Sequence, residues 1–381
     1  MLLRTPGASF FHSSAWARVL SESYGYTPLY FTVIENGKLR ALVPVMEVNS
    51  ILTGKRGVSL PFTDYCEPII NEAGEFDDLF NSVVEYGKKQ RWKYIELRGG
   101  AKYLRSLEPR TSNLAPGPSS FSVQPSAFSP QPSEAPGPSL EPQTLNLEPV
   151  PKIPRASCPA PVFITYVRNT LDLTKGEGEV FGSLRGSVRR NIKRAKARRV
   201  DIKISNESEA TKEFYRLHCI TRKQHGLPPQ PFHFFQKIHT NIILKGLGLV
   251  ALAFHNDHCI AGALFFSFGD KAIFKYGASE KKYQNLRANN LVMWEGIKWF
   301  LNHGHKSLCF GRTQLENAGL RRFKNGWGTG ENSLRYFKYD LGKMAFTAKQ
   351  TRFSIVSTRL FHWMPLPILK LAGSVLYRHI G

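Results

Sequence analysis

The stretch GLVALAFHNDHCIAGALFFSFGDKAIFKYGAS, residues 248–279, decides the fold of this protein. It contains three apolar runs, which an Asn-Asp pair at 256–257 and a Gly-Asp pair at 269–270 separate. Because such pairs favour tight turns between strands, we predict three strands here. The next segment, 289–304, has apolar side chains at helical spacing and ends at Gly304, so we predict a helix.

The neighbouring segments also alternate between strands and helices. On the C-terminal side, KSLCFGRT at 306–313 predicts a further strand. On the N-terminal side, residues 209–226 predict a helix that Gly226 closes, and strands are expected over 163–173 and 200–205. This part of the chain therefore reads as one α/β unit.

The N-terminal part of the chain shows a similar order of elements. Residues 28–50, PLYFTVIENGKLRALVPVMEVNS, place Asn-Gly between two apolar runs, which is a strong signal for a β-hairpin. A helix over 76–92 and a strand over 93–100 are expected to follow. Since both parts run hairpin, helix and strand, we predict a duplicated α/β unit.

A segment of different composition separates the two parts. Residues 107–161 hold 14 of the 24 prolines and many serines, with few large apolar side chains. Such a segment buries too little surface to offset its ordering entropy, so we predict a disordered insertion. A proline-rich peptide ligand is the alternative.

Composition and charge indicate the cellular environment and the kind of partner that suit this chain. The chain has 381 residues, about two domains, and a net charge of +23, which favours anionic partners. The five cysteines are scattered without metal-ligand spacing, so we expect reduced thiols and no metal. The N-terminus lacks the apolar core of a signal peptide, which indicates a cytoplasmic protein.

Residues 187–200, SVRRNIKRAKARRV, form a dense basic block. Eight of the fifteen residues from 185 to 199 are Lys or Arg, and no acid lies among them. On a helix, only a narrow apolar stripe faces inward, formed by Val188, Ile192 and Ala195. Either the charges form a solvated face or they bind an anion; the missing opposite charges favour the second interpretation.

Several motifs together resemble FemAB-related acyltransferases, the BioF2-like branch of the GNAT superfamily. They are SLRGSVRRNIKRAKARRV, FYRLHCITRKQHGLPPQP, the run 260–299, FGRTQLENAGLRRFKNGWG and, upstream, SLPFTDYCEPI and FFHSSAWARVLSESYGYTP. The resemblance implies an α/β (α+β) fold of two tandem GNAT-like domains, each a mixed, largely antiparallel sheet flanked by helices. Their expected bounds are 1–106 and 162–345, with the insert at 107–161 and an amphipathic tail at 346–381.

The resemblance also implies acyl or aminoacyl transfer to an amine on a cell-envelope, peptidoglycan or exopolysaccharide precursor. The co-substrate is then acyl-CoA or aminoacyl-tRNA, with no permanently bound cofactor, and the acceptor is an anionic small molecule or a lipid-linked sugar. The alternative is a non-catalytic protein that binds an anionic polymer or nucleic acid between its domains.

In GNAT proteins the donor's phosphates lie where a strand ends and a helix begins, which is a general anion site. The corresponding residues are Tyr276, Gln284, Arg287, Asn289 and Asn290. Arginine and asparagine stand where the usual pattern has glycines, so we expect Arg287 to bind phosphate directly. The alternative is that Asn289 or Asn290 only caps the helix.

Two acids are candidates for the general base. Asp64 is surrounded by apolar and aromatic residues, which can raise the pKa of a carboxyl group, and it is otherwise a turn residue or a ligand for an ammonium group. Glu295 lies on an apolar helix, where a structural pair with an arginine is the alternative. We expect one cationic cleft between the domains, lined by Tyr65, Arg189, Arg190, Arg194, Arg312, Lys324 and Trp327.

The C-terminal segment 359–381, RLFHWMPLPILKLAGSVLYRHIG, is apolar and carries cations. Its prolines and its internal lysine argue against a membrane span. We therefore expect either peripheral contact with the inner face of the cell membrane or a helix that packs on the protein itself.

Overall fold

The computed structural model describes residues 5, 7–72, 74–104, 163–347 and 360–381. The expected insert at 107–161 and Cys158 lie outside these residues. The other four cysteines are buried and free, in agreement with the expectation of reduced thiols.

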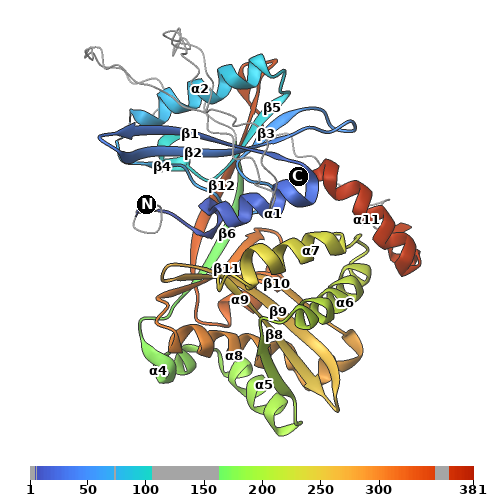
Figure 1. Ribbon diagram of the computed structural model, residues 1–381. Coiled ribbons are helices and arrows are strands. Elements are labelled where there is room, and N and C mark those ends of the chain that lie inside the picture. Colours follow the sequence, from blue (N-terminus) through green and yellow to red (C-terminus); the bar gives the residue numbers. More distant parts are fainter. Residues whose placement is uncertain (1–4, 6, 73, 105–162, 348–359) are drawn as a thin grey trace, which may run out of the picture.

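One mixed sheet of thirteen described strands runs through both halves of the molecule (Figure 1). Its main path follows the order β1-β2-β3-β5-β12-β6-β11-β10-β9-β8-β7, with β4 beside β2 and β13 beside β12. The N-terminal strands are β1 (Thr27–Glu35), β2 (Lys38–Val48), β3 (Arg56–Val58), β4 (Ile69–Ile70) and β5 (Tyr94–Arg98). The later strands are β6 (Phe163–Asp172), β7 (Asp201–Ser205), β8 (Gly248–His255), β9 (His258–Phe268), β10 (Lys271–Ser279), β11 (Ser307–Gln314), β12 (Gly330–Asp340) and β13 (Ala345–Phe346).

The fold class is confirmed, and so are the locally encoded elements. The expected hairpin is β1 and β2, with Asn36 and Gly37 at φ of 50° and 70°, as a tight hairpin turn requires. The three strands expected over 248–279 are β8, β9 and β10, which pair antiparallel. The remaining expected strands and helices also form, within a few residues of their predicted ends.

Strand β12 joins the two halves, and sequence analysis did not predict it. It pairs antiparallel with β5, with Tyr336 opposite Arg98, and along its other edge with β6, with Leu334 opposite Tyr166. Its C-terminal end contributes Phe337 to the core of the N-terminal half. The two α/β units therefore share one sheet.

Helices cover both faces of the sheet in the C-terminal half (Figure 1). Alternate side chains of β9 face opposite layers: Leu264 and Phe266 pack with α6 (Ser208–Gln224) and α7 (Phe232–Ile238), while Phe265 packs on α8 (Ala288–Asn302). Helices α4 (Gly176–Ser183) and α5 (Gly186–Ala197) lie in the α8 layer. In the N-terminal half, α2 (Glu75–Lys89) covers the sheet, and the short helix α3 (Ala101–Leu104) follows β5. Helix α9 (Ala318–Asn325) follows β11 and packs in the C-terminal half.

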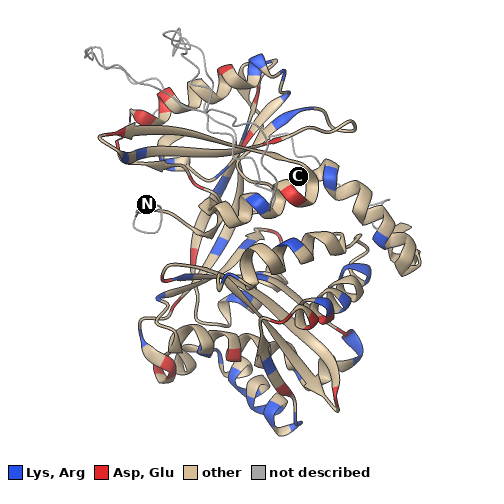
Figure 2. Ribbon diagram, in the orientation of Figure 1, with Lys and Arg blue, Asp and Glu red and all other residues tan. Residues whose placement is uncertain are grey.

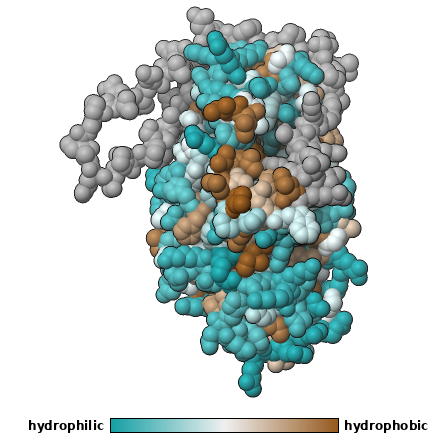
Figure 3. Space-filling view, turned by 90° about the vertical axis from the view of Figure 1, so that its right-hand side faces the viewer, coloured by the Kyte–Doolittle hydropathy of each residue, from teal (hydrophilic) through white to brown (hydrophobic). Residues whose placement is uncertain are grey.

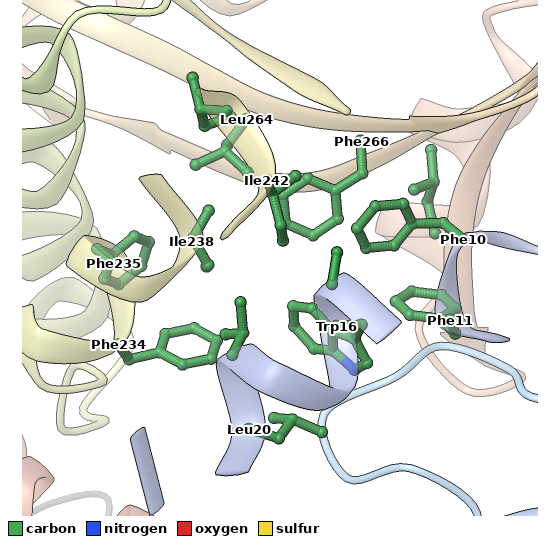
Figure 4. Close-up of a cluster of buried hydrophobic side chains, with 14 of the residues drawn as sticks. Phe10, Phe11, Trp16, Leu20, Phe234, Phe235, Ile238, Ile242, Leu264 and Phe266 are labelled. Atoms are coloured by element: carbon green, nitrogen blue, oxygen red, sulfur yellow. The ribbon is translucent and has the colours of Figure 1, made fainter. Parts of the chain in front are cut away.

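A shared aromatic core also connects the halves (Figure 4). Helix α1 (Ser14–Tyr24) belongs to the N-terminal half, yet its Trp16 is fully buried against the C-terminal half. The Trp16 ring lies 6.0 Å from Phe234 of α7 and 5.7 Å from Phe266 of β9, measured between centroids. This contact fixes the relative position of the two halves.

The tail helix α11 (Leu366–Ile380) packs on the protein itself, which is one of the two arrangements expected for this segment from the sequence. Its inner side, formed by Leu369, Gly373 and Tyr377, is buried. The Tyr26 hydroxyl donates to the carbonyl of Tyr377 at 2.9 Å, and the Arg222 guanidinium donates to the Tyr377 hydroxyl at 2.6 Å. Among the described residues, no helix has both the length and the apolar character that crossing a bilayer requires.

Candidate functional site

A cavity of about 380 Å³ opens where β10 ends and α8 begins. The short helix η6 (Lys281–Leu286) and the first turn of α8 form one wall, and the start of α5 together with α9 forms the other. Of the predicted donor-binding residues, the cavity brings together Gln284, Arg287, Asn289 and Asn290. The further lining residues are Arg185, Ser187, Val188, Asn191, Ile260, Ala261, Ser279, Glu280, Tyr283, Ala288, Gly319, Arg322, Phe323 and Gly326.

The first turn of α8 presents an anion-binding geometry to this cavity. Arg287 takes the N-cap position in the left-handed conformation, with φ of 61°, and its carbonyl accepts from the amide of Asn290 at 3.0 Å. The first N–H groups of a helix have no partner within the helix and lie at the positive end of its dipole. Neither Asn289 nor Asn290 caps the helix; the Asn289 side chain donates to Ser279 Oγ at 3.0 Å, so the capping alternative is wrong.

Three arginines add positive charge to the cavity. In the described part of the chain, Arg185, Arg287 and Arg322 have no carboxylate within 4.0 Å, and the buried Nε of Arg287 has no hydrogen-bond partner. Glu280 is the acid in the lining; burial would raise its pKa, but hydrogen bonds from Arg216, Lys282 and His258 lower it to about 2. Its charge is thus already compensated, and the cavity is suited to an anion.

Helix α5 extends the positive charge outward from the cavity (Figure 2). Its apolar stripe is buried as predicted, and its first residues line the cavity. Arg189, Arg190 and Arg194 are exposed and lie outside the lining. Together with Lys193, which is also exposed, they form a basic face (Arg189, Arg190, Lys193 and Arg194) on the helix whose first residues line the cavity.

A second group of charges lies at the centre of the shared sheet, around Asp64. The Lys275 ammonium group is 2.8 Å from Asp64 Oδ2 and also donates to the carbonyl of Phe62 at 2.6 Å. The backbone amide of Arg312 donates to Asp64 Oδ1 at 3.3 Å. Gly311, at φ of 70°, permits this approach, since a Cβ atom there would lie 2.8 Å from Asp64 Oδ1.

The expectation of a raised pKa for Asp64 is wrong. Burial acts in that direction, but the charges of Lys275, Arg312 and Lys324 outweigh it and lower the pKa of Asp64. The Asp64 carboxylate therefore stays ionised at neutral pH. It is a candidate to orient an ammonium group.

Lys324 is the titratable group of this cluster with a pKa near neutrality. Its ammonium group donates to the carbonyls of Gly311 and Arg312 at 3.0 and 3.1 Å, and its side chain has no carboxylate within 4.0 Å in the described residues. Burial lowers the pKa of Lys324 to about 8, with Asp64 acting in the opposite direction. Lys324 can therefore gain or release a proton close to neutral pH.

Aromatic rings and arginines surround the cluster. The Arg312 guanidinium lies over the rings of Tyr166 and Tyr336, 4.5 and 4.8 Å from their centroids. Arg168 lies over the Tyr65 ring at 4.7 Å. Among the predicted anion-binding residues, Arg312, Lys324 and Tyr65 thus come together around Asp64.

Other predicted site residues lie elsewhere. Trp327 is fully buried against Phe310 and Phe323, so it is a core residue and lines no cleft. Tyr276 packs against the aromatic side chains of α6 and α7 and is absent from the cavity lining, because its position on β10 faces the opposite layer. The cationic residues accordingly form two groups, around the cavity and around Asp64, and not the single cleft that was expected.

Glu295 lies apart from Asp64 and from the cavity. It is paired with Lys196 and Lys298 at 3.2 Å each, where α8 faces α5. The expected structural pair exists, although its partners are lysines and not an arginine. It lines a separate hollow with Lys196 and Asp201.

Sequence reasoning missed Lys275 and did not select Arg185 as a site residue. A signal for Lys275 was present, because a lysine in the middle of the apolar strand AIFKYGAS needs a partner or a function. In the described residues, no three His, Cys, Asp or Glu side chains gather to hold a metal ion.

Parts of the chain are similar to known proteins. Residues 182–325 match the family described as “Acetyltransferase (GNAT) domain”, a range that contains nearly all of the cavity lining. The “Lipid II:glycine glycyltransferase” of Staphylococcus haemolyticus (strain JCSC1435) is 30% identical over 127 residues, 32% of this chain and 29% of that protein. The protein of the same name from Staphylococcus epidermidis (strain ATCC 35984) is 29% identical over 103 residues, 26% of this chain and 23% of that protein. The matched segments thus span less than a third of these relatives.

Solved structures show the same fold. FemX superposes with a TM-score of 0.61 at 14% identity, over 88% of this chain and 93% of that chain. The C-terminal domain of a putative lysylphosphatidylglycerol synthetase from Agrobacterium fabrum gives 0.51 at 12% identity, over 85% of this chain and 86% of that chain. Both matches extend over the two halves and the shared sheet.

Proposed function

We propose that this chain, a FemAB-related protein of the GNAT superfamily, is an aminoacyltransferase. In this proposal it moves an aminoacyl group from aminoacyl-tRNA to an amine on a lipid-linked peptidoglycan precursor. The names of the two staphylococcal relatives support an acceptor of this class. An enzyme with such an acceptor would work in the cytoplasm, at the inner face of the cell membrane.

The observation that carries the proposal is the continuity between the basic face of α5 and the cavity. Arg185 at the start of α5 lines the cavity, while Arg190 and Arg194 are exposed further along the same helix. Lys and Arg on one face of a helix are suited to a nucleic-acid backbone. A tRNA lying along α5 would place its aminoacylated 3′ end in the cavity, against the arginines and the first turn of α8.

Acyl-CoA is the alternative donor. The side chains of Arg287 and Asn289 occupy positions where glycines would let the backbone approach a pyrophosphate, so they leave less room for that group. The basic face of α5 also extends beyond what a compact cofactor needs. Both features favour aminoacyl-tRNA over acyl-CoA.

The reaction requires a neutral amine and a stabilised oxyanion. The amine nitrogen attacks the ester carbon, a C–N bond forms, and the C–O bond to the ribose breaks. The ribose oxygen takes up the proton that the amine nitrogen loses, so it leaves as a hydroxyl group. Lys324 and Asp64 do not line the cavity that would hold the ester, so we assign neither of them a role in the proton transfer.

Arg312 is our candidate for binding the acceptor. Its guanidinium group is partly exposed and held over two tyrosine rings, which fixes its orientation. A guanidinium group in a fixed orientation can bind phosphate through two parallel hydrogen bonds. The phosphates of a lipid-linked precursor or of a soluble precursor would suit it equally well.

The test is transfer of a labelled amino acid from charged tRNA to a membrane extract that contains lipid-linked precursors. We expect the native protein to transfer the label and Arg190→Glu/Arg194→Glu to lose at least tenfold in rate at low substrate concentration. Lys38→Glu/Lys245→Glu makes the same change of charge at exposed sites elsewhere and should keep the native rate. Transfer from acetyl-CoA, with none from charged tRNA, would show that acyl-CoA is the donor. Tight tRNA binding without any transfer would favour the non-catalytic alternative.

A further inference from the structure

Helix α11 has two apolar sides, of which one packs on the protein and the other faces outward. The outward positions Ile368, Leu371 and Val375 follow one another at three and four residues, so they form one line along the helix. Their exposed fractions are 52%, 66% and 54%. A surface helix normally turns polar residues outward, and here the reverse pattern extends along most of the helix.

Two neighbouring segments extend this apolar surface. Trp363, in the helical turn 360–363 before α11, is 85% exposed. At the other end, Ile51 and Leu52 lie in the loop between β2 and β3 and are 97% and 65% exposed. We call these residues the apolar band (Ile51, Leu52, Trp363, Ile368, Leu371 and Val375).

The loop and the helix are held together. Ser50 Oγ lies 3.1 Å from His379 Nδ1, and the Thr53 hydroxyl donates to the carbonyl of His379 at 3.0 Å. Ile51 and Leu52 therefore lie between two residues that contact the C-terminal end of α11. Figure 3, which faces the side of the molecule where α11 lies, shows hydrophobic residues gathered in a band with hydrophilic residues above and below it.

The exposed charges on the tail beside the apolar band are cations. Residues 360–381 contain Lys370 and Arg378 but no Asp or Glu (Figure 2), whereas beside the loop Lys55 is paired with Glu47 at 3.2 Å and Arg56 is buried. Neither Lys370 nor Arg378 has a carboxylate within 4.0 Å in the described part of the chain. An exposed aromatic ring, aliphatic side chains and unpaired cations together match the chemistry of an anionic lipid surface.

We propose that the apolar band is a membrane-docking surface that binds anionic lipid bilayers. With 15 residues, α11 is about 22 Å long, shorter than the hydrocarbon core of about 30 Å. It therefore lies along the bilayer surface, because its inner side stays bound to the protein. Trp363 and the aliphatic side chains enter the interface, while Lys370 and Arg378 contact the lipid phosphates. The inference is independent of the donor and of the reaction.

The experiment is co-sedimentation of the full chain with vesicles of equal parts phosphatidylcholine and phosphatidylglycerol, and with vesicles of phosphatidylcholine alone. We expect binding to the anionic vesicles at low salt, weaker binding to the neutral vesicles, and release from the anionic vesicles at high salt. Leu371→Ser/Val375→Ser and, separately, Ile51→Ser/Leu52→Ser should each weaken binding at least tenfold. Ile34→Ser/Leu244→Ser replaces exposed apolar residues outside the band and should bind as the native protein does.

Two further measurements separate membrane docking from unfolding and from dimer formation. Circular dichroism melting shows whether a variant is folded; if Leu371→Ser/Val375→Ser is not, the loop variant carries the test. The fluorescence difference between the native protein and Trp363→Phe should shift to shorter wavelength with anionic vesicles. Native protein that ignores anionic vesicles at low salt, or folded band variants that bind as well as the native protein, would overturn the proposal. A native dimer that the band variants convert to a monomer would also overturn it, by identifying a second copy as the partner.

Discussion

Replacing Asp64 with Asn should expose how strongly the central charges depend on one another. The Lys275 side chain is 6% exposed, and its ammonium group lies 2.8 Å from the Asp64 carboxylate, which is 18% exposed. Removing one partner of a buried ion pair costs about 3–5 kcal/mol, because the other charge remains buried without compensation. Since Asp64 keeps some contact with solvent, we expect Asp64→Asn to lower the free energy of unfolding by about 3 kcal/mol.

The double variant Asp64→Asn/Lys275→Met separates this cost from packing. It removes both charges, so we expect it to be more stable than Asp64→Asn alone. Urea unfolding at neutral pH measures both values, and Glu316→Gln, at an exposed site, serves as the matched control. A loss below about 1 kcal/mol for Asp64→Asn, or a double variant less stable than the single one, would refute the conclusion that the buried charges of Asp64 and Lys275 depend on each other.

The pH dependence of the same pair has a definite sign. Because the folded protein lowers the pKa of Asp64, the unfolded chain binds more protons at acid pH. The stabilisation is present above the ordinary aspartate pKa and is lost as the pH falls through the lower, folded value. The difference in stability between the native protein and Asp64→Asn should therefore shrink on acidification.

Three further predictions concern the core, the lysine and the helix cap. Trp16→Ala should cost about 3–5 kcal/mol in urea unfolding, because Trp16 is fully buried between the halves, whereas Ile34→Ala should cost little. Burial lowers the pKa of Lys324 from 10.5 to about 8. Between these two pH values the unfolded chain therefore binds more protons than the folded protein, so the stability of the native protein relative to Lys324→Met should rise with pH across this window. Arg287→Gly should stay within about 1 kcal/mol of native stability, since glycine adopts φ of 61° easily, but should bind tRNA at least fivefold more weakly.

Sequence predicted the elements that depend on local pattern. Asn36-Gly37 and the Asn256-Asp257 turn fix hairpins by their own backbone preferences, and both form as expected. Strand β12 was not predicted because its partners, β5 and β6, are far away in the chain on opposite sides of the insert. Its pairing is a long-range property that no local pattern encodes.

The candidate site could be predicted only where residues follow one another along one element. Gln284, Arg287 and Asn290 line the cavity because a short helix and the first turn of α8 place them together. Lys324 and Trp327 are three residues apart in one motif, yet Lys324 faces Asp64 and Trp327 enters the core. Which of the two faces the site depends on the packing of α9 against β11.

The most direct test of the central claim, that the cavity receives the aminoacyl end of a tRNA bound along α5, is photo-crosslinking. A tRNA charged with an amino acid that carries a diazirine is bound to the full chain and irradiated, and mass spectrometry locates the modified residues. We predict crosslinks in 284–290 and 319–326, which coenzyme A does not displace and which Arg190→Glu/Arg194→Glu reduces strongly. Crosslinks confined to other parts of the chain, or complete protection by coenzyme A with no effect of the α5 substitutions, would contradict it.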